Sequence, residues 1–217
     1  MTEATRTLLR QSTRQARHNL SAEAQELAAA KLYEQVTAQD FFNNANIIAF
    51  YQTIDGEISP QLLLNAALQA GKSCYLPIIE AAHADDAAQD IHDEQEAAPA
   101  SSDNDTQLIT FAPVTETTVL QKNKWGIAEP PAENRLPPAQ FDLMLIPLVA
   151  FDTQCNRLGL GKGFYDKTLA FKHANPKSKP LLVGLAHECQ LLDNMPTTSH
   201  DVRLDAVVTD RKIYLSK

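Results

Sequence analysis

Short continuous apolar runs alternate along this chain with stretches of helical periodicity. The first 40 residues have the helical pattern. Ser21 is a typical N-cap residue, and Ala28, Leu32 and Val36 recur at a spacing of four, which places them on one helix face. We therefore expect two helices before the first strand.

Buried strands are predicted where apolar residues follow one another without interruption. A helix over residues 62–70 is expected between the first two such runs, because Ser59-Pro60 is a typical helix start and Gly71 a typical end. A strand, helix, strand order implies a parallel pair joined by a right-handed crossover. A further helix is expected over residues 164–171. The predicted strands are 47–51, 74–79, 108–112, 141–149, 181–185 and, as the last strand, 204–209.

This alternation predicts an α/β fold of three layers. We expect a mostly parallel sheet with helices on both faces, Rossmann-like in architecture, with binding loops at the carboxyl ends of the strands. The 217 residues, 44% of them apolar, are enough for a single domain spanning residues 1–217.

Composition and charge narrow the class of protein. The longest apolar run is far below the roughly 20 residues of a membrane helix. Three widely spaced cysteines favour neither a disulfide framework nor a zinc site, so we expect a cytoplasmic protein, and a monomer. The net charge is −8, and no nucleic-acid partner is expected. Much of that charge lies between Glu80 and Asp105, so an acidic, mobile surface insertion is predicted at about 81–106.

The most informative segment for function runs from Arg157 to Asp166. It contains Gly159, Gly161 and Gly163, whose backbone can approach an anion closely and direct successive N–H groups at it. Arg157 and Lys162 add positive charge, and the Asp166 carboxylate suits a magnesium ion on bound phosphates. A phosphate-binding loop is predicted, with an ordinary glycine-rich turn as the alternative.

The segment differs from two common nucleotide-binding signatures. A dinucleotide fingerprint follows its strand directly, with the spacing Gly-x-Gly-x-x-Gly, which is absent here. A Walker A loop has Ser or Thr after its lysine, whereas Lys162 is followed by Gly163. No Gly-x-Ser-x-Gly motif occurs, so a hydrolase triad has little support.

Three other features have both a functional and a plain interpretation. Asp55-Gly56-Glu57 follows the first predicted strand. Glu57 fits either of two roles there: it accepts hydrogen bonds from a ligand, or it is an acidic residue in the first turn of a helix after a plain Asp-Gly turn. Asp201 is either a second carboxylate ligand of a metal ion or part of an ordinary polar loop. The N-terminal arginines share one helix face, which suits phosphate contacts or, more commonly, solvation: Arg6, Arg10, Arg14 and Arg17.

Together these motifs resemble the 5-formyltetrahydrofolate cyclo-ligases, which are also called 5,10-methenyltetrahydrofolate synthetases. The resemblance extends over most of the chain, and its most specific part is Arg-Leu-Gly-x-Gly-x-Gly-x-Tyr-Asp from Arg157 to Asp166. The other matching segments are the basic N-terminal helix, residues 55–57, 126–130 and 146–166, 184–186 with Gln190, and 200–209.

The resemblance implies an enzyme that uses ATP as co-substrate and Mg²⁺ as cofactor. It implies phosphorylation of the formyl oxygen of 5-formyltetrahydrofolate and ring closure by N10, giving 5,10-methenyltetrahydrofolate, ADP and phosphate. Arg157 and Lys162 are implied as catalytic, and Asp166 and Asp201 as metal-binding. The implied ATP-binding residues are Arg6, Arg10, Arg157, Leu158, Gly159, Leu160, Gly161, Lys162, Gly163, Phe164 and Tyr165. The implied substrate-binding residues are Tyr51, Glu57, Gly161, Phe164 and Tyr165.

The chain departs from the family pattern in a few places. Arg6 stands where Lys is usual, Phe164 where Tyr is frequent, and the acidic insertion is longer than the norm. Two alternatives stay open. One is another phosphate-handling α/β enzyme, such as a small kinase or a sugar-phosphate isomerase, and the other is a relative that binds folate or nucleotide without turnover.

Overall fold

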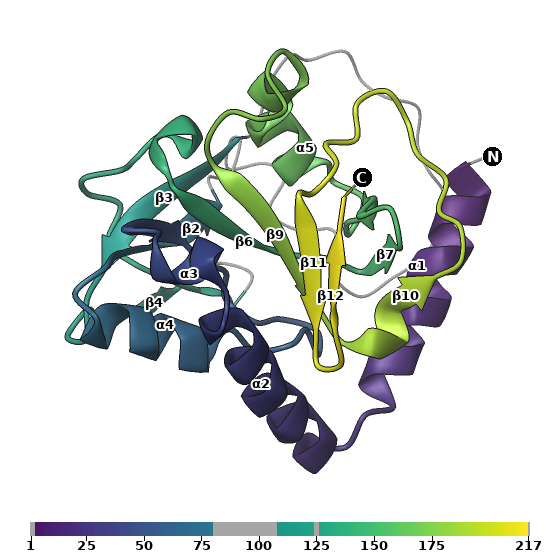
Figure 1. Cartoon of the computed structure of the whole chain (residues 1–217), viewed down its shortest axis with the longest axis horizontal. Helices are drawn as coiled ribbons and strands as arrows, with labels where there is room; N and C mark the ends of the chain where they lie inside the picture. The colour runs from purple at the N-terminus through teal and green to yellow at the C-terminus, as the bar shows by residue number, and fades with distance from the viewer. Residues whose placement is uncertain (1–2, 80–107, 124–125, 217) are drawn as a thin grey trace.

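The computed structural model describes residues 3–79, 108–123 and 126–216, and three helices precede its first strand (Figure 1). They are α1 (Glu3–His18), α2 (Ala22–Thr37) and the short α3 (Asp40–Asn43). The Ser21 hydroxyl accepts a hydrogen bond from the Ala24 N–H at 3.2 Å, so the predicted N-cap of α2 is confirmed. The expected first two helices are present, and α3 is an addition. The segment predicted to be a mobile insertion lies outside the described residues.

A seven-stranded sheet forms the centre of the molecule, in the order β12-β11-β9-β6-β1-β2-β3. Its five inner strands are parallel, and the edge strands β3 and β12 are antiparallel to their neighbours. The crossover from β1 to β2 contains α4 (Gln61–Gln69), as expected. The strands are β1 (Ile47–Ala49), β2 (Ser73–Ile79), β3 (Ile109–Val114), β6 (Leu143–Pro147), β9 (Leu181–Ala186), β11 (Ala206–Thr209) and β12 (Ile213–Leu215).

The strand expected over 204–209 is present as β11 and ends at Thr209, but the expectation that it is the last strand is wrong. The chain turns after β11 and returns as β12, which pairs Ile213 with Val208 and Leu215 with Ala206. A return strand of three residues is too short for its alternation to stand out in the sequence.

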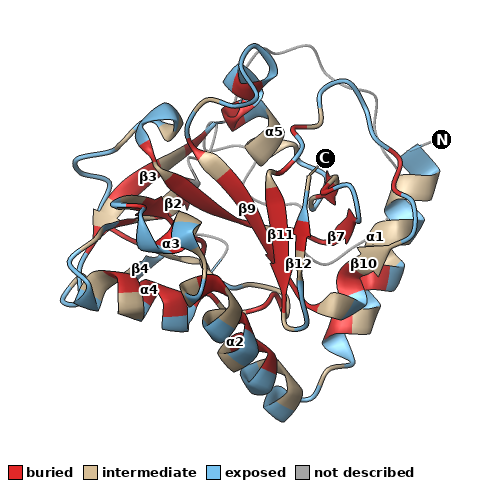
Figure 2. Ribbon diagram, in the orientation of Figure 1, coloured by how far each residue is buried: buried red, intermediate tan, exposed pale blue. Residues whose placement is uncertain are grey.

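The sheet is covered on both faces, because successive side chains of each inner strand point to opposite sides. Leu143 and Leu145 of β6 pack with α2 and α4, whereas Met144 and Ile146 pack with residues around α5 (Phe164–Thr168). In Figure 1, α2 and α4 lie together on the side of the sheet away from α5. All four of these β6 side chains are buried, as are most sheet residues in Figure 2. This accounts for continuous apolar runs rather than alternating ones.

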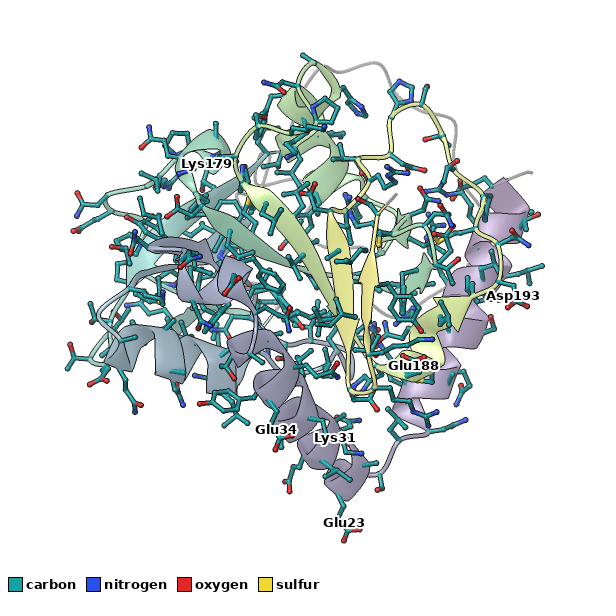
Figure 3. The ribbon with its side chains drawn as sticks, viewed as in Figure 1. Glu23, Lys31, Glu34, Lys179, Glu188 and Asp193 are labelled. Atoms are coloured by element: carbon teal, nitrogen blue, oxygen red, sulfur yellow. The ribbon has the colours of Figure 1, made fainter. Side chains whose placement is uncertain are left out.

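Two small sheets and three 3₁₀ turns complete the described structure. One small sheet has the order β10-β7-β8 and lies beside α1 (Figure 1), and the other pairs β4 with β5. Within the described ranges, no helix is long and apolar enough to cross a membrane. On the outer side of α2, Glu23, Lys31 and Glu34 are exposed (Figure 3). The remaining bounds are β4 (Gln121–Lys122), β5 (Ala128–Glu129), β7 (Ala150–Asp152), β8 (Arg157–Leu158), β10 (Leu191–Leu192), η1 (Pro138–Gln140), η2 (Ala170–His173) and η3 (Glu188–Gln190).

Candidate active site

The glycine loop connects β8 to α5, with two of its glycines in the left-handed region. Gly161 has a φ of 106° and Gly163 a φ of 68°, where Gly163 is the N-cap of α5. The backbone N–H groups of residues 160–163 donate no hydrogen bond to another described residue, so they are available to a ligand. The helix after the loop has only five residues, fewer than the predicted eight, before the chain continues as η2. The backbone donors and side-chain cations of the loop therefore matter more than a helix dipole.

Arg10 of α1 lies directly over this loop. Its Nε donates to the Gly159 carbonyl at 3.0 Å, and a Cβ atom added to Gly161 would lie 3.4 Å from the Arg10 Cζ. One Nη also pairs with the exposed Glu3 at 2.8 Å. Lys162 is exposed and makes no hydrogen bond or ion pair with the described residues. The loop thus has one anchored cation and one cation available to a phosphate.

Arg157 is buried beneath the loop and paired with Asp166. Its Nη2 donates to the Asp166 Oδ1 at 2.6 Å, and its Nη1 donates to the Val202 carbonyl. Burial lowers the pKa of Arg157, an effect that the Asp166 carboxylate opposes. The Val202 N–H also donates to the Asp166 Oδ1, at 3.0 Å. These bonds bring Asp166 beside the 201–202 segment, 36 residues away along the chain.

Arg6 and Asp201, predicted for nucleotide and metal respectively, form a bidentate pair. The Arg6 Nη1 and Nη2 lie 2.9 and 3.2 Å from the two carboxylate oxygens of Asp201. The Thr198 N–H also donates to Asp201, at 2.8 Å. Burial raises the pKa of Asp201, but Arg6 and Thr198 outweigh it and the net shift is downward. Arg6 therefore makes a specific tertiary contact, whereas the interpretation of the N-terminal arginines as solvated side chains predicted none.

Glu57 is buried close enough to the two predicted substrate tyrosines, Tyr51 and Tyr165, for its charge to affect both. Glu57 is 6% exposed. Burial raises the pKa of its carboxyl group to about 7, although the Arg17 charge lowers this pKa. Burial and the Glu57 charge both raise the pKa of Tyr51 and of Tyr165. The Tyr51 hydroxyl donates to the Ile58 carbonyl. Tyr165 is the second residue of α5, directly after the glycine loop, and Arg157 lowers its pKa, so Glu57 lies near the loop as well.

The other predicted ligand-binding residues have different environments. Leu158 is fully buried in the core, so only its backbone can face a ligand. Leu160 is 50% exposed at the loop tip, and Phe164 packs partly against the core on the α5 side of the sheet. Of these three, Leu160 has the side chain most accessible to a bound molecule.

Comparisons with known proteins identify the family. Residues 2–210 match the model of the 5-formyltetrahydrofolate cyclo-ligase family. The 5-formyltetrahydrofolate cyclo-ligase of Escherichia coli strain K12 is 33% identical over 204 residues, which cover 93% of this chain and 98% of that protein. The Haemophilus influenzae protein of the same name is 33% identical over 90% of this chain and 92% of its own length. The chain belongs to the 5-formyltetrahydrofolate cyclo-ligase family.

The fold agrees with that of a solved cyclo-ligase relative. The structure of Aquifex aeolicus 5,10-methenyltetrahydrofolate synthetase is 26% identical and superposes with a TM-score of 0.75, covering 97% of this chain and 92% of that one. The predicted resemblance and the predicted three-layer α/β fold are therefore confirmed, and this family member is a ligase by class.

The two predicted metal carboxylates of this cyclo-ligase family member differ in availability. Asp166 uses Oδ1 for Arg157 and Val202, so its Oδ2 is available to a ligand. Both oxygens of Asp201 accept hydrogen bonds from Arg6. Among the described residues no three His, Cys, Asp or Glu side chains form a metal cluster. This pattern fits an ion held by one or two carboxylates and substrate phosphates, the usual arrangement for Mg²⁺, better than a metal held by protein alone.

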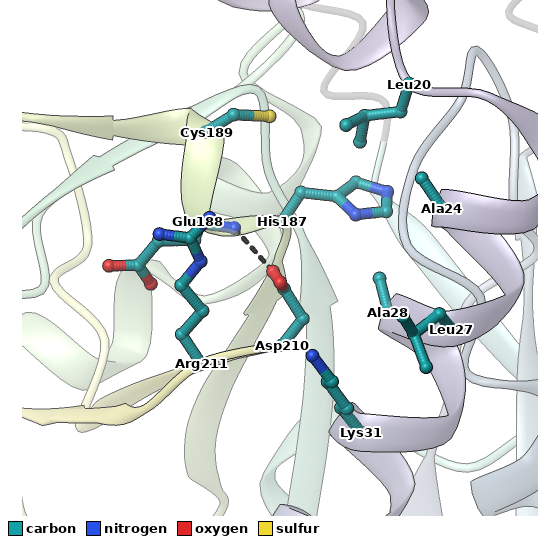
Figure 4. A pocket seen from close by; sticks show the side chains of 10 residues that line it. All are labelled: Leu20, Ala24, Leu27, Ala28, Lys31, His187, Glu188, Cys189, Asp210 and Arg211. Atoms are coloured by element: carbon teal, nitrogen blue, oxygen red, sulfur yellow. Dashed lines mark hydrogen bonds between the residues drawn. The ribbon is translucent and has the colours of Figure 1, made fainter.

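A small pocket of ≈ 210 Å³ lies apart from the predicted site residues, between α2 with Leu20 on one side and residues 187–189 and 210–211 on the other (Figure 4). His187 points into it between Leu20 and Ala24, and neither ring nitrogen has a hydrogen-bond partner in the part of the chain that the structure describes. Burial lowers the pKa of His187, although Asp210 and the Gly56 backbone oppose the shift. The imidazole is therefore neutral at pH 7. On the pocket rim, the Glu188 N–H donates to Asp210 at 2.8 Å.

Sequence reasoning missed the residues that join the parts of this site. Arg17 was considered only as one of four arginines on a helix face, yet it is fully buried against Asp55. Gln190 donates to the carbonyls of Leu148 and Val149 at 2.7 and 2.8 Å, where the chain leaves β6 toward the glycine loop. The signals in the sequence were the spacing of the basic residues before an Asp-Gly turn and the family resemblance at Gln190, and neither identifies a partner.

Proposed function

We propose that this protein catalyses the ATP-dependent cyclisation of 5-formyltetrahydrofolate to 5,10-methenyltetrahydrofolate, with release of ADP and phosphate. Family membership supports this reaction. The observation that carries it to this site is that Tyr165, two residues after Gly163 of the loop, is near enough to Glu57 and to Arg157 for both to shift its pKa. A buried carboxyl group suited to an uncharged, hydrogen-bonding ring system thus adjoins a loop suited to phosphates.

In the proposed site, phosphates bind at the glycine loop. The N–H groups of residues 160–163 and the Lys162 ammonium approach the phosphate oxygens, while Arg10 keeps the loop in place through Gly159. Lys162 neutralises charge that builds up on the transferred phosphoryl group. Arg157 has a supporting role in this arrangement, because its guanidinium is directed to Asp166 and Val202.

The folate is proposed to bind against Glu57, Tyr51, Tyr165 and Phe164. The formyl oxygen on N5 then attacks the γ-phosphorus of ATP, forming an oxygen–phosphorus bond as the bond to the β-phosphate oxygen breaks and ADP leaves. N10 next attacks the activated formyl carbon and loses its proton to the departing phosphate, and the carbon–oxygen bond breaks with release of phosphate. The protein positions the two substrates and stabilises charge, and no side-chain nucleophile is required.

Mg²⁺ belongs to the proposal as well, with Asp166 as its protein ligand. When bound with ATP, the ion would neutralise part of the phosphate charge. Asp201 would be a second ligand through a remaining lone pair of Oδ1, which accepts a hydrogen bond from the Arg6 Nη2. The expected cytoplasmic location and monomeric state remain proposals, and size-exclusion chromatography with light scattering tests the second.

The direct test is the growth of absorbance in the methenyl-folate band after the purified protein is mixed with 5-formyltetrahydrofolate, ATP and Mg²⁺. Growth that requires ATP and is matched by ADP release is the expected result. ADP release without the absorbance change would replace the proposal by another phosphoryl-transfer reaction. Folate binding without either change would identify a binding protein that lacks turnover.

A further inference from the structure

Three basic residues of α1 converge on one acidic residue, Asp55. Arg14, Arg17 and His18 share a helix face because they are spaced by three and four residues. The Arg14 Nε lies 2.8 Å from Asp55 Oδ2, and His18 Nε2 lies 2.7 Å from Asp55 Oδ1. Arg17 donates to the same carboxylate and also to the Asp55 backbone carbonyl, at 2.7 Å. Burial raises the pKa of Asp55, but Arg14 and Arg17 outweigh it, so Asp55 stays ionised at neutral pH.

Asp55 belongs to the tight turn that carries Glu57. Asp55 and Gly56 both have positive φ, 52° and 73°, and the Glu57 N–H donates to the Ile54 carbonyl at 3.0 Å. The Glu57 carboxylate also accepts the Ile54 N–H, at 3.3 Å. Positive φ at both central residues is typical of a type I′ turn, for which Asp-Gly is a preferred sequence, so the turn itself forms locally and tertiary contacts fix only where it lies relative to the sheet. The position of the Glu57 carboxyl therefore depends on what holds Asp55.

Arg17 is the most buried of the three basic residues and reaches beyond the turn. Its side chain is 0% exposed, against 40% for Arg14 and 43% for His18. Its Nη1 donates to the Leu148 carbonyl at 3.4 Å, and Gln190 donates to that same carbonyl. Leu148 follows β6 on the path to the glycine loop. Arg17 thus lies between the Glu57 turn and the strand end that leads to the phosphate side of the site.

We propose that Arg17 is a positioning residue of the active site. It holds the Asp55–Gly56 turn so that the Glu57 carboxyl faces the folate, and it fixes the position of this turn relative to the glycine loop. The inference rests on the proposed function, because it assumes that Glu57 contacts the folate. Arg17 itself is not exposed to a substrate.

The groups that face Glu57 determine how the loss of Arg17 changes the pH profile. They are Arg17 from α1, Asp55 from the turn, Tyr51 after β1 and Tyr165 from α5. Arg17 is the one cation among them and lowers the pKa of Glu57, so its removal raises that pKa further. If ionised Glu57 binds the folate, the acid limb of kcat/KM moves to higher pH.

Steady-state kinetics of Arg17→Met test the inference, with Arg14→Met as the matched control. Arg14 binds the same carboxylate but is more exposed, whereas Arg17 is buried and also donates to the Leu148 carbonyl. We expect Arg17→Met to raise the KM for 5-formyltetrahydrofolate by about tenfold or more, the effect of one lost charged hydrogen bond, with the KM for ATP changed less than about threefold. Its acid limb should move upward, and Arg14→Met should change either KM less than about threefold.

Gly56→Ala perturbs the same turn without removing a charge. An added Cβ atom would lie 3.1 Å from the His18 Cδ2, at a φ that side chains rarely adopt. We expect a raised KM for 5-formyltetrahydrofolate with the acid limb unmoved. If Arg17→Met does not fold, as judged by circular dichroism, this variant decides the question.

The outcomes separate the two proposals. A wild-type protein without ATP-dependent methenyl formation contradicts the proposed function. An active wild type contradicts the inference in three cases: if Arg17→Met keeps both KM values, if Arg14→Met reproduces its full effect, or if Gly56→Ala leaves the folate KM unchanged.

Discussion

The buried carboxyl of Glu57 predicts a pH-dependent stability that a single substitution removes. Burial raises its pKa from the usual 4.5 to about 7. The folded state therefore binds this proton more tightly than the unfolded state does. Below pH 4.5 Glu57 is protonated in both states and does not change the free energy of unfolding. Between pH 4.5 and 7 its ionisation lowers this free energy progressively, and above pH 7 the decrease is complete. The shift corresponds to about 3 kcal/mol, and because the residue is 6% exposed, screening by solvent reduces it little.

Glu57→Gln keeps the shape of the side chain and abolishes its titration. The free energy of unfolding of the variant relative to wild type should therefore increase by about 3 kcal/mol between pH 4.5 and pH 8. For a chain of this length this corresponds to roughly 6–12 °C in the difference between the two Tm values. The sign is set by the direction of the shift, since a raised carboxyl pKa penalises the ionised form at high pH.

Thermal unfolding followed by circular dichroism at pH 4.5, 6, 7 and 8 measures this difference. Glu34→Gln, at an exposed carboxylate of α2, is the matched control and should give a Tm difference from wild type that is nearly constant with pH. The reasoning fails if the difference between Glu57→Gln and wild type is as constant as that of the control, or if it favours wild type at high pH.

Three further predictions concern the loop and the sheet. Lys162→Ala should lower kcat/KM about a hundredfold with no change in Tm, since this exposed side chain has no partner among the described residues; unchanged kinetics would refute its role. Asp166→Asn should abolish turnover in the absorbance assay. It should also lower the free energy of unfolding in urea by about 2 kcal/mol, because Arg157 loses its charged partner, and equal stability would contradict this. Gly184→Ala places a Cβ atom 2.6 Å from Leu204 and 2.7 Å from Leu148, so we expect a loss of about 2 kcal/mol, measured by urea unfolding; no loss would show that β9 relaxes freely.

Much of the fold could be predicted because inner parallel strands are apolar on both faces. The runs that became β1, β2, β6 and β9 stand out for that reason, and α2 has a visible cap and a regular apolar stripe. The strands β7, β8 and β10 have only two or three residues, which is too few to show a period. They form through pairing with one another, and their sequences alone do not predict it.

The sequence by itself determined the local chemistry of the candidate site. Gly161 and Gly163 have positive φ because glycine tolerates it, and Lys162 between them is exposed on the same loop. Such features depend on neighbouring residues, and so they can be recognised in a short stretch of chain. The family resemblance was recognisable for the same reason.

Only the tertiary structure decided which distant residues act together. Arg17 meets Asp55 across 38 residues and Arg6 meets Asp201 across 195, because folding brings α1 against the turn after β1 and against the loop before β11. The raised pKa of Glu57 likewise comes from atoms that surround it only in the folded chain. Hydrogen-bond partners and desolvation depend on distances in space, and the order of residues along the chain does not specify those distances until the elements have packed.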